Sequence, residues 1–317
     1  MVTKLAKKTP GRTAARTADE AAAGAAGDSD GAMSAKTSRT SAHSRARPRA
    51  QSNALALVTG ASCGIGESLA HRFAKAGHDM ILVARSADKL KALADELKSR
   101  YGVAAFVEAV DLSVPGAAAK LGAALNRKKH APDVLVNCAG VLSQGLFTGM
   151  SAATQQQMID LNISGLTSMI SEFLPGMAER AGQGARGRIL NVASIAAFQP
   201  IPSLATYAAS KAFVLSLTES LSEELKGTGV TVTALCPGMT ATAMLTGAAS
   251  ANDKVSQIPA FMVGEVNDVA RQGFEACMRG DVICVPGAVN RAVTLGSRAT
   301  PKWLVRKIGG LIVRNAL

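Results

Sequence analysis

The chain has 317 residues, of which 48% are hydrophobic, so it is long and apolar enough to form one sizeable core. Its net charge of +12 is unevenly placed. Residues 1–52 carry ten Lys or Arg and four Asp or Glu, and residues 291–317 carry six Lys or Arg and no Asp or Glu. The body between these two segments is therefore neutral. This distribution argues against a body that binds nucleic acid. The five cysteines are scattered and lack the paired spacing of metal ligands, which argues against a metal site and against a disulfide framework. We therefore expect a cytoplasmic protein with reduced thiols.

Residues 1–52 are rich in Ala, Ser, Thr, Gly, Lys and Arg and have almost no large apolar side chain. Such a segment cannot bury enough surface to offset its ordering entropy, so we predict a disordered basic tail. It has no apolar run of a secretory signal, and its four acidic residues argue against a transit peptide. A polyanion-binding arm is the alternative to a solvated tail.

From residue 53 onward, strand and helix patterns alternate, which predicts an α/β fold of the Rossmann type: a doubly wound, mostly parallel sheet of seven strands with helices on both faces. Strands are expected at 54–59, 79–84, 103–110, 132–136, 187–193, 229–235 and 281–285. Helices are expected at about 64–77, 86–100, 115–128, 151–173, 205–226 and 265–279. Segment 240–264 has no clear period and is interpreted as a mobile loop over the site. No apolar run reaches the roughly 18 residues of a transmembrane helix.

The first expected strand leads directly into a glycine-rich loop that is followed by a helix. Gly60 would permit the tight turn out of the strand, and Gly64 would let the backbone approach a phosphate. Gly66 would let the helix lie near the sheet, with its amide-rich N-terminus facing the anion. This order of elements predicts a site for a dinucleotide pyrophosphate.

Arg85 ends the second expected strand, 19 residues after Gly66. An acidic residue near this position would bind the ribose 2′-hydroxyl of NAD, whereas an arginine suits a 2′-phosphate. Since Ala84 and Arg85 provide no carboxylate, the sequence favours NADP(H), with NAD(H) as the alternative.

Tyr207 and Lys211 are four residues apart at the start of an expected helix, which places them on one face, one turn apart. An ammonium group at this distance is expected to stabilise a phenolate and to lower the tyrosine pKa, as a proton-transferring tyrosine requires. Ser194 ends the fifth expected strand, at the sheet edge where ligands of open α/β sheets bind. Asn162 lies inside a helical stretch, where asparagine has no obvious local use.

Taken together, these residues resemble the short-chain dehydrogenase/reductase family. The matching motifs are Thr59-Gly60-x3-Gly64-x-Gly66, Asn137-x-Ala139-Gly140, Asn162, Ser194, Tyr207-x3-Lys211 and Pro237-Gly238. The resemblance covers about residues 53–290, which it implies are an NAD(P)-binding catalytic domain of the short single-domain branch, followed by a basic amphipathic extension at 291–317. Cys138 departs from the usual Asn-Asn-Ala-Gly, which puts side-chain hydrogen bonds at that position in doubt.

The resemblance implies a mechanism in which Tyr207 donates its proton to a carbonyl oxygen that Ser194 polarises, while hydride reaches the carbonyl carbon from NADPH. Lys211 would lower the Tyr207 pKa and bind the nicotinamide ribose, and Asn162 would hold a water that links Lys211 to solvent. Asp111 resembles the residue that contacts adenine, although an acid at a helix N-terminus explains it equally well. The implied cofactor contacts are Thr59, Gly60, Ser62, Gly64, Ile65, Gly66, Arg85, Asp111, Asn137, Ala139, Gly140, Tyr207, Lys211, Pro237, Gly238, Thr240 and Thr242.

The substrate is expected to be a lipophilic ketone, a steroid or a 3-oxoacyl chain, because the segments around the site are mostly apolar. The apolar residues concerned are Leu142, Leu146, Phe147, Ile195, Phe198, Ile201, Leu204, Met239, Met244 and Leu245. Two alternatives without turnover remain at this point: a nucleotide-sensing regulator on the same fold and a polyanion-binding protein.

Two association hypotheses follow from helical patterns. The helix 205–226 is apolar on several faces, which predicts a homodimer or homotetramer formed through it. Residues 301–317 place Trp303, Leu304 and Ile308 on one helical face and basic residues on another, which favours weak contact with an anionic membrane; packing on the body is the alternative.

Overall fold

The structure, a computed structural model, describes residues 53–241 and 263–299, all of them in the unit formed by residues 51–317. Its centre is a seven-stranded, fully parallel sheet with the order β3-β2-β1-β4-β5-β6-β7, which confirms the predicted fold class. The strands are β1 (Leu55–Thr59), β2 (Asp79–Ala84), β3 (Ala105–Ala109), β4 (Val134–Asn137), β5 (Gly187–Val192), β6 (Val230–Leu235) and β7 (Ile283–Cys284).

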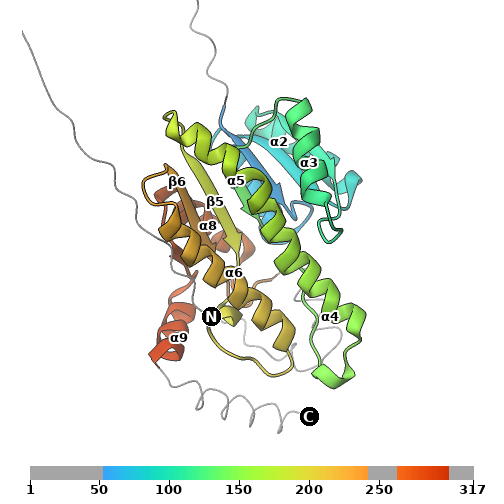
Figure 1. Cartoon of the computed structure of the whole chain (residues 1–317), viewed down its shortest axis with the longest axis vertical. Helices are drawn as coiled ribbons and strands as arrows, with labels where there is room; N and C mark the ends of the chain where they lie inside the picture. The colour runs from blue at the N-terminus through green and yellow to red at the C-terminus, as the bar shows by residue number, and fades with distance from the viewer. Residues whose placement is uncertain (1–52, 242–262, 300–317) are drawn as a thin grey trace, which may run out of the picture. The chain divides into compact units, whose positions relative to one another are not determined.

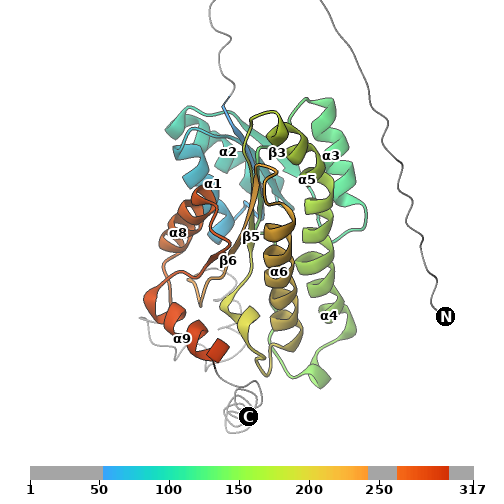
Figure 2. The same cartoon turned by 60° about the vertical axis from the view of Figure 1, so that its left-hand side comes forward.

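Helices cover both faces of the sheet (Figures 1 and 2). One face carries α1 (Gly64–Lys75), α2 (Ala87–Tyr101) and α8 (Val266–Arg279), and the other carries α3 (Ala117–Arg127), α5 (Leu166–Gly182) and α6 (Ala205–Glu224). Successive strand residues point to opposite faces, so Leu57 joins one core cluster while Ala56 and Val58 join the other. Burial on both faces explains why the strands are almost continuously apolar.

The strand order reverses direction between β1 and β4, which are paired through Val58 and Val136. Because all strands are parallel, the segments that follow β1, β2, β4, β5 and β6 emerge at one edge of the sheet. A crevice outside the carboxyl ends at such a reversal is where open α/β sheets bind ligands. The glycine loop, Arg85, the segment 137–140, Ser194 and Pro237-Gly238 follow these strand ends, whereas Asn162, Tyr207 and Lys211 lie on helices.

The helix expected at 151–173 is interrupted in the structure. It consists of α4 (Ala152–Ile159), a π-helical turn at Asp160–Gly165, and α5, which ends nine residues later than expected. π-Turns inside helices often occur at functional sites, and this one contains Asn162. Hydrophobic periodicity does not distinguish this turn from an ordinary helix, because a segment of six residues is too short to define a period.

Further differences lie toward the C-terminus. The strand expected at 281–285 has two residues, and a helix that the sequence did not predict, α9 (Ala288–Ala299), follows it across the predicted boundary at 290. Short 3-10 turns occur at Phe147–Gly149 and Ile195–Phe198, the latter called η3. The predictions for the tail 1–52, Thr242, Met244, Leu245, most of loop 240–264 and the segment 301–317 lie outside the described residues. Within the described residues, no helix is long and apolar enough to span a membrane.

Candidate active site

The glycine loop between β1 and α1 has the geometry of a close backbone approach. Gly60 has φ of +66°, a left-handed conformation that favours glycine, and a Cβ there would lie 2.9 Å from the Cα of Ala139. A Cβ on Gly66 would lie 2.2 Å from the carbonyl oxygen of Gly60, so only glycine lets α1 begin against the strand end. The loop therefore leaves the N-terminal amides of α1 open toward the strand ends, as an anionic ligand requires.

Thr59 ties this loop to the segment after β4. Its hydroxyl donates to the carbonyl of Val136 (3.2 Å) and accepts from the amides of Cys138 and Ala139 (3.0 Å each). This arrangement fixes residues 138–140 beside the glycine loop, which brings two of the predicted cofactor segments together. Ser62 and Ile65 lie in the same loop and in the first turn of α1.

Asn137 lies inside the sheet. Its side-chain amide donates to Asn191 of β5 (2.9 Å), whose amide donates to Thr218 of α6 (2.9 Å). The Asn137 side chain thus links β4 to β5, and its buried Oδ1 has no hydrogen-bond partner among the described residues. Burial raises the pKa of the neighbouring Cys138 thiol to about 12, so the unusual cysteine stays neutral at ordinary pH.

Arg85 and Asp111 lie near one another at the carboxyl ends of β2 and β3. The Asp111 carboxylate accepts from the amide and hydroxyl of Ser113, and these hydrogen bonds, with a smaller effect of the Arg85 charge, hold its pKa below the ordinary value. Arg85 is exposed, and within the described residues its guanidinium forms no ion pair that would neutralise it. A free guanidinium at this position is suited to a phosphate.

Tyr207 and Lys211 face each other across one turn of α6, with the Lys211 Nζ 5.7 Å from the centre of the Tyr207 ring. Lys211 is buried and donates to the carbonyl of Val192 at the end of β5 (2.9 Å). A Cβ on Gly140 would lie 3.6 Å from the same Nζ, so the glycine leaves room for the ammonium beside the 138–140 segment. Two N–H groups of Lys211 remain for a ligand.

Burial controls both pKa values. It lowers the Lys211 pKa to about 8, and it raises the Tyr207 pKa above its ordinary value, with a hydrogen bond to Ser194 acting in the opposite direction. The sequence-based expectation that the Tyr207 pKa is lowered is therefore wrong for the protein alone. The phenolate loses its hydration on burial, and this cost outweighs the stabilising groups around it.

Ser194 follows β5 and begins η3. Its hydroxyl accepts from the amide of Ala196 (3.1 Å) and donates weakly to the carbonyl of Pro237 (3.5 Å), which also accepts from the amide of Ile195 (2.9 Å). The Pro237-Gly238 segment is thereby held against the serine. Thr240 is buried, and its hydroxyl donates back to the carbonyl of Gly238 (3.1 Å).

Asn162 shapes the site through its side chain. The Asn162 amide group exchanges two hydrogen bonds with the main chain of Val141 (2.9 Å each) and donates a third to Ser210 (3.2 Å). Because both amide hydrogens are engaged, the side chain could hold a proton-relay water only through the second lone pair of its Oδ1. The role of Asn162 in such a relay stays a prediction.

Sequence reasoning missed Ser210 and Val141. Ser210 donates to the carbonyl of Tyr207 (2.7 Å) and accepts from Asn162, so it joins two catalytic candidates. Serine in a helix commonly bonds to a preceding carbonyl, and nothing in the sequence marks this one. Val141 acts through its main chain, which no side-chain pattern can reveal.

The predicted apolar pocket is only partly assembled by the described residues. Phe198 and Ile201 line an open cavity of about 500 Å³ between residues 197–202 and α6, whereas Leu146 and Phe147 are exposed. On α6 the cavity is lined by alanines at 205, 208, 209 and 212. At 100° per residue, this face is turned away from that of Tyr207 and Lys211. The cavity therefore lies on a different face of α6 from Tyr207 and Lys211.

These features fit a dinucleotide. The glycine loop, which a Cβ would block, has the shape to take a pyrophosphate, and the exposed Arg85 and the buried Lys211 beside Gly140 would then be candidates for the two ends of the cofactor. Ser194 and Tyr207 then flank the place where a carbonyl or alcohol would react.

The comparisons with known proteins agree. A sequence profile of the short chain dehydrogenases matches residues 54–253. The chain is 34% identical over 222 residues to a 3-oxoacyl-[acyl-carrier-protein] reductase of Staphylococcus epidermidis, covering 69% of this chain and 88% of that protein. It is 38% identical over 187 residues to an NADP-dependent 3-hydroxy acid dehydrogenase of Salmonella typhi, covering 58% and 72%.

A solved short-chain dehydrogenase from Sphingobium yanoikuyae, in complex with NADPH, superimposes with a TM-score of 0.67 at 33% identity, covering 77% of this chain and 92% of that one. Profile, sequence relatives and fold thus agree with the motifs that converge at the strand ends. The chain belongs to the short-chain dehydrogenase/reductase family of oxidoreductases, which act on alcohol and carbonyl groups.

Proposed function

We propose that this protein is an NADP(H)-dependent reductase of a lipophilic carbonyl compound, such as a 3-oxoacyl chain, a steroid or another apolar ketone. The observation that carries the proposal is the convergence of Ser194, Tyr207 and Lys211 at the carboxyl edge of the sheet, beside a glycine loop suited to a pyrophosphate. The NADPH-bound neighbour and the relatives named for 3-oxoacyl and 3-hydroxy acid substrates support the cofactor and the substrate class. NAD(H) is the alternative cofactor.

NADPH, when bound, supplies the hydride that reduces the carbonyl carbon. The residues of the chain provide the proton and the orientation. Tyr207, whose pKa is raised by burial, stays protonated at neutral pH and donates its hydroxyl proton to the carbonyl oxygen. Ser194 donates a hydrogen bond to the same oxygen, and the Lys211 ammonium favours the phenolate that forms. The same groups serve alcohol oxidation in the opposite direction.

A panel of ketones and 3-oxoacyl thioesters, assayed with NADPH and with NADH, tests this proposal. Oxidation of the cofactor that depends on the substrate is expected. A protein that binds NADPH without turnover of any member, or that binds only polyanions, would instead be a sensor or a binding protein. Complete retention of the Ser194, Tyr207 and Lys211 set argues for the enzyme.

Arg85→Ala is expected to raise the KM for NADPH about 10- to 100-fold and to leave the KM for NADH nearly unchanged. Only NADPH carries the 2′-phosphate, and a charge-assisted hydrogen bond to it contributes about 1.5–3 kcal/mol. Steady-state kinetics with both cofactors measures the effect. The matched control is Arg100→Ala, which removes an exposed arginine near the end of α2. Equal changes for both cofactors would show that Arg85 is merely structural.

We also propose self-association through α6. Its exposed face carries Ala205, Ala209, Phe213, Ser216 and Ser220, small side chains that permit close helix packing around one aromatic. Phe213→Asp is expected to convert a dimer or tetramer into smaller species in light scattering at micromolar concentration. Val282→Asp, equally exposed (38% against 39%), should leave the mass unchanged. A monomeric mass for the wild-type protein would refute the proposal.

We also propose that the protein is cytoplasmic and that its basic C-terminal region makes weak contact with a membrane. The segment that motivated the membrane contact, 301–317, lies outside the described residues. The helix that precedes it, α9, is described.

A further inference from the structure

Helix α9 exposes its large apolar side chains, whereas two of its polar ones, Asn290 and Thr294, are turned toward the body of the protein. Thr294 is 5% exposed and Asn290 is half-buried, whereas Val289, Val293 and Leu295 are 52%, 48% and 67% exposed. These are three of the eight large apolar residues that are exposed in the described part of the chain, and they lie within seven residues. A surface helix normally has the opposite orientation, so the exposed face of α9 requires an explanation.

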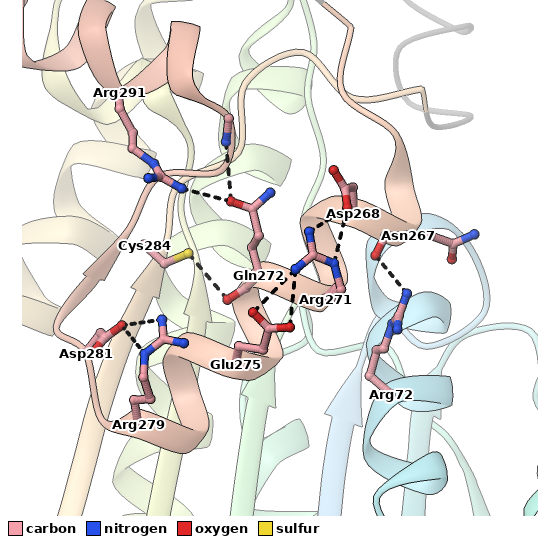
Figure 3. A network of polar contacts seen from close by, with 11 residues as sticks. Arg72, Asn267, Asp268, Arg271, Gln272, Glu275, Arg279, Asp281, Cys284 and Arg291 are labelled. Atoms are coloured by element: carbon pink, nitrogen blue, oxygen red, sulfur yellow. Dashed lines mark hydrogen bonds and ion pairs between the residues drawn. The ribbon is translucent and has the colours of Figure 1, made fainter.

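This orientation is fixed by specific contacts. The side chain of Asn290 donates to the carbonyl of Pro286 (2.9 Å) and lies directly against Gly238, where a Cβ would be 2.6 Å from it. Gln272 of α8 accepts from the amide of Gly287 and from Arg291 (Figure 3). Arg291 also donates to the carbonyl of Val285 (3.0 Å). The polar contacts hold the inner side of α9, and Val289 and Val293 consequently point outward.

The charge of this region is unbalanced, in contrast to that of α8. On α8, Arg271 pairs with Asp268 and Glu275, and Arg279 pairs with Asp281 (Figure 3). The hydrogen-bond acceptors of Arg291 are neutral, so its charge is not cancelled by them. From residue 282 to residue 317 the sequence contains no acidic residue and six basic ones: Arg291, Arg298, Lys302, Arg306, Lys307 and Arg314.

We propose that α9 contacts an anionic lipid bilayer, with Val289, Val293 and Leu295 in the interface and Arg291 at the level of the headgroups. At 100° per residue, Leu295, Ala292, Gly296, Val289 and Val293 form one continuous arc, with Arg291 beside Leu295. This combination of an apolar face and adjacent cations is typical of helices that lie in a membrane interface. The proposal extends the hypothesis of membrane contact, made above for residues 301–317, to α9, whose exposed face the structure describes.

Other partners fit the surface less well. Two copies that met through this region would bring together two sets of cations with no acid, and like charges across an interface are unfavourable. Nucleic acid would accept the cations but not the aliphatic side chains, and within the described residues α9 carries no aromatic side chain on which a base could stack. A bilayer accepts both features.

The position of α9 links the surface to the active site. The helix packs against η3, which follows Ser194, and Figures 1 and 2 place it beyond the carboxyl end of β5. A bilayer at this end would present lipophilic molecules at the edge of the sheet where Ser194 and Tyr207 lie. This consequence rests on the proposed function, whereas the lipid contact itself does not.

The test measures partition of the full-length protein with vesicles by flotation, without any turnover. Wild-type protein is expected to bind vesicles that contain anionic phosphatidylglycerol at low salt, to bind pure phosphatidylcholine weakly, and to dissociate as salt increases. The double variant Val289→Asn/Val293→Asn, which keeps the charge, should lower the partition coefficient about tenfold. Val114→Asn changes a valine of equal exposure (53%) elsewhere on the surface and should have no effect.

Circular dichroism and thermal melting check that each variant is folded. If the double variant is unstable, Leu295→Asn, at the most exposed of the three positions, provides a second measurement of the partition coefficient. Equal partition of wild-type and α9 variants would overturn the proposal and leave the basic segments as the only lipid contact. Absence of binding to anionic vesicles at low salt would overturn it as well. So would a change in oligomeric mass of the α9 variants without vesicle binding, since this would identify a second copy as the partner. None of these outcomes affects the reductase assay.

Discussion

Tyr207→Phe is expected to lower the turnover number by at least about 10³-fold while NADPH still binds with nearly unchanged affinity. The substitution keeps the ring, its packing on α6 and its place 5.7 Å from Lys211, and removes only the hydroxyl that gives the proton. Ser194→Ala is expected to cost less, about 10²-fold, because the serine polarises the oxygen without transferring its proton. Stopped-flow or steady-state oxidation of NADPH with an active carbonyl substrate measures both.

Tyr101→Phe is the control for this experiment, because it removes the hydroxyl of the only other tyrosine in the chain. Tyr101 lies at the end of α2, against His71 and Arg100, and should not affect turnover. NADPH binding, followed by fluorescence, separates a lost proton donor from a damaged cofactor site. Near-normal turnover of Tyr207→Phe would contradict the assigned mechanism.

The sequence predicts the fold well because the fold depends on repeated features. Most of the buried strands are largely apolar, and the glycines at 60 and 66 occupy positions where a side chain would collide with the backbone. The apolar pattern recurs from strand to strand, so several separate segments support the same fold. The strand expected at 281–285 is present but short, whereas α9 was not predicted because polar contacts from Gln272, Asn290 and Arg291 fix its position, and these contacts produce no hydrophobic period.

The residue types of the site follow from the sequence, but their electrostatics do not. Spacing places Lys211 beside Tyr207, yet it does not show that both are buried, and burial raises the Tyr207 pKa where the sequence suggested the opposite. Likewise, the sequence marks Asn162 without showing that its amide is used by Val141 and Ser210. These properties depend on which main-chain groups the fold brings near each side chain.

Lys211 offers the second large effect, because it is buried with a pKa lowered to about 8 from an ordinary value of 10.5. Below about pH 8 the ammonium is charged and favours the Tyr207 phenolate, so kcat/KM for carbonyl reduction should fall as pH rises through about 8. Lys211→Met removes the charge and the ribose contact. It should lower kcat about 10²- to 10³-fold, raise the KM for NADPH and abolish this pH dependence.

The same substitution is expected to stabilise the fold at neutral pH. The folded-state pKa is lower than the unfolded one, so between about pH 8 and 10.5 the unfolded chain binds more protons and stability rises with pH. Below pH 8 the buried charge therefore costs up to about 3 kcal/mol, at 1.36 kcal/mol per pKa unit. Loss of the hydrogen bond to Val192 offsets about 1–2 kcal/mol of the gain.

Lys211→Met should accordingly unfold at a free energy higher by about 1–2 kcal/mol at pH 7, and this gain should shrink between pH 8 and 10.5. Urea unfolding at several pH values, followed by circular dichroism, measures the difference. Lys226→Met, at an exposed lysine just beyond the end of α6, is the control and should change neither stability nor its pH dependence. A less active Lys211→Met that is also less stable at pH 7 would show that the ammonium contributes more through its hydrogen bonds than its burial costs. An inactive but more stable protein would show that this buried cation is kept for catalysis at the expense of stability.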